Sequence, residues 1–154
     1  MPCKCNNAEF HMIVRDFEYG DLKQVMEIVY NSFEEYYTSD FFLSIWQASP
    51  EGFIVAEEGG KVVGFVMGVI SEPGTIRILM ICVREGYRNR GIGSELMSRI
   101  AKRFRNARKI RLEVKVTNKD AIRFYKKHGF VIKETLSEFY PDNQDGYLME
   151  KLLF

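Results

Sequence analysis

The spacing of apolar residues along the chain predicts an alternation of helices and strands. Apolar side chains recur at helical spacing in four stretches, at residues 22–33, 41–48, 96–104 and 121–125. Asp21 and Asn118 are suited to cap the first and the last of these helices. Pro50 is expected to end the second helix, and Gly129 the last one.

Strand patterns fill the intervals between these helices. Apolar or alternating runs predict strands at residues 53–58, 61–70, 75–83, 109–116, 130–138 and 146–152. Gly59 and Gly60 predict a tight hairpin turn between the first two strands, because both glycines accept a positive φ. This order of elements indicates an α/β (α+β) fold, in which helices cover a mixed sheet.

Length and composition fit one globular domain. The chain has 154 residues, of which 46% are hydrophobic and 28% charged, an ordinary balance for a domain with a real core. Its apolar runs are too short to cross a bilayer, and its first residues lack the apolar segment of a secretory signal. We therefore expect no membrane association and a cytoplasmic location, with residues 1–11 as a flexible tail and residues 12–154 as a single domain.

The three cysteines, an odd number, do not indicate a disulfide framework. Cys3 and Cys5 could hold a metal ion together with His11, but the chain has no second pair of ligands. Free thiols in a tail are the simpler interpretation, and no metal is expected. Cys82 lies within an apolar strand and is expected to be buried and inert.

The charges are unevenly distributed, although the net charge is only +1. Residues 9–58 contain eleven acidic residues against two basic ones, whereas residues 84–111 contain ten basic residues against two acidic ones. The small net charge argues against general nucleic-acid binding. The uneven distribution indicates that one surface meets a cation and another an anion.

The segment Arg88–Ser94, RNRGIGS, has the features of an anion-binding turn at the start of a helix. Its glycines let the backbone approach a phosphate, and its arginines add charge-assisted hydrogen bonds. It lacks the third glycine of the dinucleotide fingerprint and the Gly-Lys-Ser/Thr of the P-loop. A tight strand-to-helix turn with solvated arginines is the alternative, and two glycines alone do not decide between them.

The longer sequence VREGYRNRGIGSEL resembles the acetyl-CoA signature of the GCN5-related N-acetyltransferase (GNAT) family, with Arg88, Gly91 and Gly93 in the matching places. LEVKVTNKDAIRFYKKHGF, at residues 112–130, resembles the second motif of that family. With GKVVGFVMG and FYPDNQDGYLM, the resemblance extends over residues 12–154. It implies a central mixed, mostly antiparallel twisted sheet flanked by helices, and acetyl-CoA as co-substrate.

The resemblance also implies which residues bind the coenzyme. The glycine turn would hold the pyrophosphate, the strand Ile81–Val83 would offer backbone groups to the pantetheine arm, and the Val83 N–H would polarise the thioester carbonyl. Asn118 has a helix cap as its alternative role. The full expected set is Ile81, Cys82, Val83, Arg88, Asn89, Arg90, Gly91, Ile92, Gly93, Ser94, Asn118, Tyr125 and Lys127.

Within the family, the chain is most similar to the RimI-like and catalytic-subunit type protein N-terminal acetyltransferases. Glu113 and Tyr125 stand twelve positions apart, as the general base and general acid do in RimI-like enzymes. From the residues alone, Glu113 could equally be an exposed, charge-paired strand residue and Tyr125 a core aromatic. Tyr37 and Tyr140 fall where the group places aromatic residues around the incoming N-terminus.

One residue departs from the pattern of these relatives, and one group of residues supports the likeness. Some relatives carry a histidine where this chain has Arg77. The acidic residues Glu34, Glu35 and Asp40 surround Tyr37, where a protonated amine or a basic peptide would be attracted. A solvated helical face is the alternative for the acidic side chains.

The sequence therefore predicts an N-acetyltransferase that moves an acetyl group from acetyl-CoA to the N-terminal α-amino group of proteins, by direct attack in a ternary complex. A lysine, a polyamine or another small amine is the alternative acceptor, and a non-catalytic acyl-CoA-binding regulatory domain is the alternative class. The α-amine is favoured because its pKa, about 7.7–8.0, lies well below that of lysine, about 10.4. No nucleic-acid or membrane partner is expected, while ribosome association and homodimer formation stay open.

Overall fold

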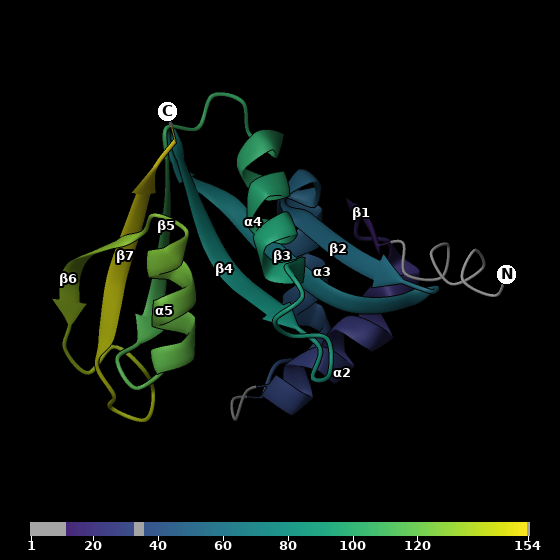
Figure 1. Cartoon of the computed structure of the whole chain (residues 1–154), viewed down its shortest axis with the longest axis horizontal. Helices are drawn as coiled ribbons and strands as arrows, with labels where there is room; N and C mark the ends of the chain where they lie inside the picture. The colour runs from purple at the N-terminus through teal and green to yellow at the C-terminus, as the bar shows by residue number, and fades with distance from the viewer. Residues whose placement is uncertain (1–11, 33–35, 154) are drawn as a thin grey trace, which may run out of the picture. The chain divides into compact units, whose positions relative to one another are not determined.

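The structure is a computed structural model that describes residues 12–32 and 36–153 (Figure 1). The predicted tail with Cys3, Cys5 and His11, and the acidic Glu34 and Glu35, lie outside the described residues. In chain order the elements are β1 (Met12–Asp16), α2 (Leu22–Ser32), α3 (Ser39–Ala48), β2 (Phe53–Glu58), β3 (Lys61–Glu72), β4 (Thr75–Val83), α4 (Ile92–Arg103), β5 (Lys109–Lys115), α5 (Lys119–Lys127), β6 (Val131–Leu136) and β7 (Gly146–Leu152).

The described strands form a sheet in the order β1-β2-β3-β4-β5-β7-β6. The pairs β1–β2, β2–β3, β5–β7 and β6–β7 are antiparallel, and the pair β4–β5 is parallel. This topology confirms the predicted mixed, mostly antiparallel sheet with helices beside it. The chain divides into two compact units, one formed by the residues up to Gly68 with Leu79–Arg103, the other by Val69–Ile78 with the residues from Phe104 onward.

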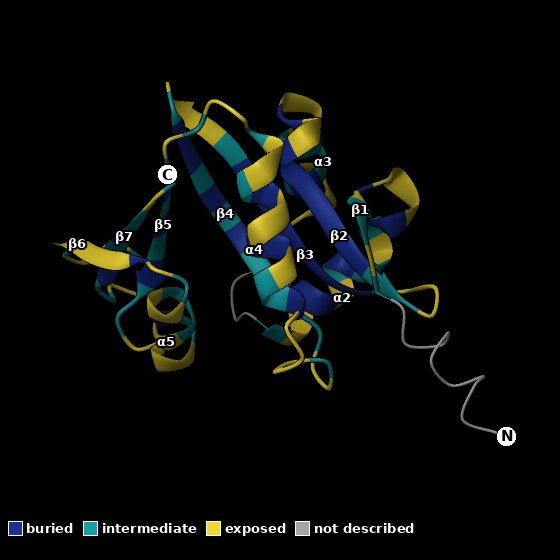
Figure 2. Ribbon diagram, turned by 45° about the horizontal axis from the view of Figure 1, so that its top comes forward, coloured by how far each residue is buried: buried dark blue, intermediate teal, exposed yellow. Residues whose placement is uncertain are grey.

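The core of the first unit lies on both faces of β2 and β3, which are buried over most of their length (Figure 2). One face packs against α2 and α3, and Val29 and Phe42 of these helices cluster with Phe53 and Phe65 of the strands. Because side chains alternate along a strand, Ile54 points to the other face, where α4 packs against β2. The predicted hairpin turn is confirmed: Gly59 and Gly60 have φ values of +59° and +79°.

Asp21 does not have the capping role that the sequence indicated. It ends a short 3₁₀ turn, Tyr19–Asp21, ahead of α2. Its buried carboxylate accepts the Glu18 N–H at 2.8 Å and two hydrogen bonds from Arg15, at 2.8 and 2.9 Å. The bond from Glu18 belongs to a capping box in which Asp21 is the third residue of the 3₁₀ turn, and Arg15 also binds Glu57 at 2.7 Å.

Further differences from the prediction concern the start of α3 and the strand β1. The helix expected from Phe41 begins at Ser39, because the side chain of Thr38 accepts the Phe41 N–H at 3.3 Å and caps the helix there. The strand β1 was not predicted. It has five residues, and its partner strand β2 lies about 40 residues further along the chain.

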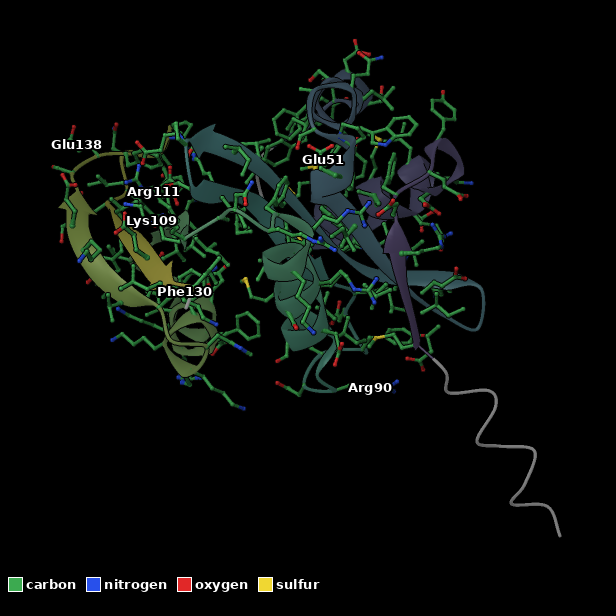
Figure 3. The ribbon with its side chains drawn as sticks, turned by 90° about the horizontal axis from the view of Figure 1, so that it is seen from above. Glu51, Arg90, Lys109, Arg111, Phe130 and Glu138 are labelled. Carbon is green, nitrogen blue, oxygen red and sulfur yellow. The ribbon has the colours of Figure 1, made fainter. Side chains whose placement is uncertain are left out.

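The second unit places a polar and an apolar face on the same strand. Along β5, buried residues alternate with half-exposed ones, as predicted. The helix α5 lies along one face of β5 and β7 (Figure 1), and Figure 3 shows Lys109 and Arg111 on one side of these strands and Phe130 on the side of α5. The buried residues of this unit are Thr75, Ile76, Ile78, Ile110, Leu112, Val114, Ile122, Phe130, Gly146 and Met149.

Candidate active site

In the first unit, the turn between β4 and α4 contains three residues with left-handed backbone conformation. Gly86, Asn89 and Gly91 have φ values of +89°, +63° and +86°, a region that favours glycine and asparagine. The Gly91 carbonyl accepts the Glu95 N–H at 3.0 Å, so α4 begins directly after this glycine. The predicted RNRGIGS turn is therefore the start of a helix.

The backbone at Gly91 is open to a ligand. No heavy atom lies within 4 Å of the position that a Cβ at Gly91 would occupy. A helix start offers N–H groups that are not bonded within the helix, together with the positive end of the helix dipole. These features fit a phosphate group, which is the group that the coenzyme would place here.

Gly64 on β3 determines how closely this helix start approaches the sheet. A Cβ at Gly64 would lie 3.0 Å from the Cys82 carbonyl oxygen, 3.1 Å from Ile92 Cγ2 and 3.3 Å from Leu96 Cδ1. Any side chain at this position would push β4 or the first turn of α4 away. Gly64 was not among the predicted site residues, although the stretch GKVVGFVMG that contains it carries part of the family resemblance.

The arginines of the turn are engaged within the protein. Arg88 donates from Nε to the Val83 carbonyl at 3.0 Å and from Nη2 to Ser32 Oγ at 3.3 Å. Arg90 lies 3.4 Å from Glu58 and its guanidinium is 5.0 Å from the centre of the Tyr87 ring. Arg88 and Arg90 thus brace the turn through contacts within the protein.

Arg84, the first residue after β4, was not predicted. Its Nε donates to the Val62 carbonyl at 3.0 Å, and its Nη1 lies 3.5 Å from a carboxylate oxygen of Glu27. Its Nη2 is buried without a hydrogen-bond partner in the described part of the chain. The guanidinium therefore brings a positive charge to the base of the turn. The described neighbours satisfy its hydrogen-bond donors only in part.

The end of β4 contains the three residues that were predicted to bind the pantetheine arm. Cys82 is buried, while Ile81 and Val83 on either side are half-exposed. Burial raises the pKa of the Cys82 thiol to about 12, and the nearby charge of Arg88 opposes this only partly. Cys82 is thus protonated at neutral pH, in agreement with the predicted inert thiol.

Tyr37 also belongs to the first unit. It packs partly buried against the core, with its ring centre 5.1 Å from that of Phe41 and 6.2 Å from that of Phe42. Its carbonyl accepts the hydroxyl of Tyr30 at 3.4 Å. The helix α3 therefore supports the position of this tyrosine.

In the second unit, Glu113 lies on the polar face of β5, opposite the face that α5 covers. Two nitrogens of one guanidinium bind its carboxylate: Arg77 Nη2 lies 2.5 Å from Oε1 and Arg77 Nε lies 3.3 Å from Oε2. The Glu113 side chain is 14% exposed, and that of Arg77 is 41% exposed. The sequence alone gave no sign that Arg77 pairs with Glu113.

The predicted residues of α5 lie near the other face of the sheet. Asn118 caps the helix, since its Oδ1 accepts the Ala121 N–H at 3.2 Å. The ring of Tyr125 packs 5.6 Å from that of the buried Phe130, between ring centres. The Phe130 N–H returns to the Tyr125 carbonyl at 3.0 Å, which fixes the end of the helix beside Lys127. The candidate base and the candidate acid therefore belong to opposite faces of β5.

Tyr140 lies in the loop between β6 and β7, at residues 137–145. The Tyr140 N–H donates to the Gln144 carbonyl at 3.2 Å, and the Tyr140 carbonyl accepts the Asn143 N–H at 2.8 Å. The ring of Tyr140 lies 5.3 Å from the ammonium of Lys115, measured to its centre. The predicted site residues thus fall into two sets, with the turn, the β4 end and Tyr37 in the first unit and the others in the second.

The described residues contain no group of three or more histidine, cysteine, aspartate and glutamate side chains that could hold a metal ion. None of the described helices is both long and apolar enough to traverse a bilayer.

Comparison with known proteins identifies the relatives of this chain. A model of the acetyltransferase (GNAT) family matches residues 22–130. The N-alpha-acetyltransferase of Sulfurisphaera tokodaii is 33% identical over 150 residues, which cover 88% of this chain and 90% of that protein.

Solved structures give the same result. Ard1 from Thermoplasma volcanium is 38% identical and superposes with a TM-score of 0.89, over 93% of this chain and 98% of that one. Naa20 from Chaetomium thermophilum, solved in complex with a bisubstrate analogue, is 27% identical with a TM-score of 0.82, over 92% of this chain and 86% of that one. These matches confirm the predicted fold and an acetyl-CoA-dependent N-acetyltransferase. The chain belongs to the acetyltransferase (GNAT) family.

Proposed function

We propose that this enzyme transfers the acetyl group of acetyl-CoA to the N-terminal α-amino group of proteins. The observation that carries the proposal is the pairing of Glu113 with Arg77. A guanidinium that binds both oxygens fixes the position and direction of this carboxylate. The fixed carboxylate can take a proton from an amine that reaches it, and an amine that loses its proton easily is best suited to such a transfer.

The ease of deprotonation favours an α-amine as the acceptor. An α-amine with a pKa near 7.8 is already neutral in about one molecule in ten at pH 7, whereas a lysine side chain near 10.4 is neutral in fewer than about one in a thousand. The difference costs a lysine acceptor about 3.5 kcal/mol at the same site. The relative from Sulfurisphaera tokodaii is itself an N-alpha-acetyltransferase, which supports the same acceptor here.

The coenzyme would be held by the turn and the strand before it. The N–H groups at the start of α4, Ile92 and Gly93 among them, would bind the pyrophosphate, with Gly91 leaving the approach open. Ile81 and Val83 would bind the pantetheine arm through their backbone, and the Val83 N–H would stabilise negative charge on the carbonyl oxygen. The remaining coenzyme contacts that we propose are those of Cys82, Arg88, Asn89, Arg90, Ser94, Asn118, Tyr125 and Lys127.

Two residues would handle the protons of the reaction. Glu113 accepts a proton from the amine, directly or through a water molecule, as the nitrogen forms its bond to the acetyl carbon. The carbon–sulfur bond breaks, and Tyr125 gives its hydroxyl proton to the departing thiolate. Tyr37 and Tyr140 would hold the first residues of the peptide, with aromatic rings beside its backbone.

The experiment that tests this proposal maps the acetylated nitrogen. Peptides that carry both a free N-terminus and an internal lysine are incubated with enzyme and acetyl-CoA, and the modified atom is identified by tandem mass spectrometry. We expect acetylation of the α-nitrogen. Modification of the lysine, or turnover only with spermidine, would replace the proposed acceptor, and the absence of turnover with every amine would point to a binding domain.

A further inference from the structure

Lys115 on β5 contacts the loop that carries Tyr140. Lys115 Nζ lies 3.0 Å from Asp142 Oδ2, and the same ammonium lies 5.3 Å from the centre of the Tyr140 ring. The Lys115 charge also holds the pKa of Asp142 below its usual range, with help from the Gln144 N–H. One cation on the strand therefore contacts both a carboxylate and an aromatic ring of the loop.

A glycine on the neighbouring strand makes room for that ring. Lys115 on β5 is paired in register with Gly146, the first residue of β7. A Cβ at Gly146 would lie 3.0 Å from Tyr140 Cε2 and 3.5 Å from Phe139 Cδ2. The Tyr140 ring thus occupies the space that a side chain opposite Lys115 would otherwise fill.

The rest of the loop is braced so that this placement is fixed. Asp142 accepts two hydrogen bonds from Gln144, at 3.2 Å from its backbone and 3.0 Å from its side chain. Gln144 in turn accepts the Thr117 hydroxyl at 2.8 Å. Asp145 accepts the Glu138 N–H at 2.9 Å and so ties the two ends of the loop together. A loop with these bonds has few conformations to choose from.

Lys115 lies on the same face of β5 as Glu113. The two residues are two positions apart, which corresponds to about 7 Å along the strand. The distance between the Tyr140 ring and the carboxylate of Glu113 is therefore set by a short, rigid path through β5. A loop placed in this way defines how far an acceptor can advance along the strand before its amine meets Glu113.

We propose that Lys115 and Gly146 are positioning residues that together hold the Tyr140 ring in place. We propose further that this position of the ring sets the affinity for the acceptor peptide. This inference rests on the proposed function, in which Tyr140 contacts the peptide. Lys115 acts through Tyr140 and does not take part in proton transfer. Displacement of the Tyr140 ring should therefore weaken binding of the acceptor peptide and leave kcat and coenzyme binding unchanged.

The test measures the peptide KM, kcat and the acetyl-CoA Kd of the full-length enzyme, with a peptide that has a free N-terminus and no lysine. We expect Lys115→Met to raise the peptide KM about fivefold, the size of a lost cation–π contact, with kcat and the acetyl-CoA Kd within about twofold of wild type. Lys115→Arg should retain most of the affinity. Gly146→Ala should raise the KM similarly, because its methyl group displaces the ring. Lys133→Met, at an exposed position on β6, is the matched control and should not change the KM.

A double-mutant cycle separates positioning from direct contact. In a Tyr140→Ala background, Lys115→Met should have no further effect on the peptide KM, because the residue that it positions is gone. An unchanged KM in Lys115→Met, or the same fivefold increase with and without Tyr140, would overturn the proposal. The wild-type enzyme is assayed with the peptide and with spermidine at the outset. A preference of the wild-type enzyme for spermidine would contradict the proposed function. A preference for the peptide, together with an unchanged peptide KM in Lys115→Met, would contradict only the positioning role of Lys115.

Discussion

Arg77 binds both carboxylate oxygens of Glu113, at 2.5 Å through Nη2 and at 3.3 Å through Nε. The two residues are 36 positions apart and come together because β4 and β5 run parallel, with Arg77 opposite Arg111. A bidentate guanidinium fixes the direction of the carboxylate as well as its charge. The candidate base is therefore oriented before any substrate arrives.

Replacing Glu113 by glutamine should lower kcat most at neutral pH. We expect a decrease of about tenfold or more at pH 7, since general-base catalysis contributes about a hundredfold or more in many enzymes. The deficit should shrink as the pH approaches 9, because an α-amine then loses its proton without help. The measurement is kcat across pH 6 to 9 with saturating peptide. Wild-type kcat at every pH would remove Glu113 from the mechanism.

Replacing Arg77 should separate orientation from charge. Arg77→Met leaves the carboxylate of Glu113 without its bidentate partner, so we expect a lower kcat with an unchanged acetyl-CoA Kd. Arg77→Lys should recover only part of the activity, because an ammonium cannot bind both oxygens in the same fixed plane. Steady-state kinetics and calorimetry on the two variants test this. Equal activity of the lysine variant and the wild type would mean that charge alone is needed.

The glycine turn allows a matched pair of substitutions. Gly86 and Gly91 both have a positive φ, and in both cases no heavy atom lies within 4 Å of the missing Cβ. Alanine at either position should therefore cost a similar free energy of unfolding, about 1–2 kcal/mol. Gly91→Ala should in addition raise the acetyl-CoA Kd at least about tenfold, a loss of about 1.4 kcal/mol in binding. Calorimetry that finds equal coenzyme affinity in the two folded variants would contradict a role for this turn in phosphate binding.

Asp21 should contribute to stability only above acidic pH. Burial by itself would raise the pKa of this carboxyl, but the hydrogen bonds from Arg15 and the Glu18 N–H outweigh burial and hold the pKa below its usual value of 3.8. A carboxyl with a lowered pKa in the folded state stabilises the protein above the unfolded pKa, and this contribution is lost as the pH falls through the folded pKa.

We therefore expect Asp21→Asn to lower the free energy of unfolding by roughly 1–3 kcal/mol at pH 7, with a smaller difference from wild type below about pH 4. Urea unfolding at pH 7, 5 and 3 measures this. A difference that stays constant down to pH 3 would show that the ionised carboxylate is not the stabilising form.

Local patterns predicted the parts of the fold that local patterns determine. The run TIRILMICV forms β4 with the expected bounds, Gly59 and Gly60 form the hairpin turn, and Asn118 caps α5. Each of these depends on the propensities of a few consecutive residues. The glycine turn was found for the same reason, since helix start and glycine spacing are adjacent in the sequence.

The features that were missed depend on residues distant in the chain. Nothing near Arg77 indicates that its partner is Glu113, because the pairing depends on which strand becomes the parallel neighbour of β4. Asp21 was interpreted as a cap because Arg15 could not be recognised as its partner without the packing of β1. The space opposite Lys115 at Gly146 likewise requires the register of β5 and β7. Long-range register is set by packing across the sheet, and hydrophobic periodicity does not specify it.

The most direct test compares kcat/KM for two matched peptides of the same internal sequence. One has a free N-terminus and no lysine, and the other has a blocked N-terminus and one internal lysine. An enzyme with this guanidinium-bound carboxylate as its base should acetylate the first peptide at least about tenfold faster at pH 7.5, because the α-amine is the easier of the two to deprotonate. Faster acetylation of the blocked, lysine-containing peptide would contradict an N-terminal acetyltransferase.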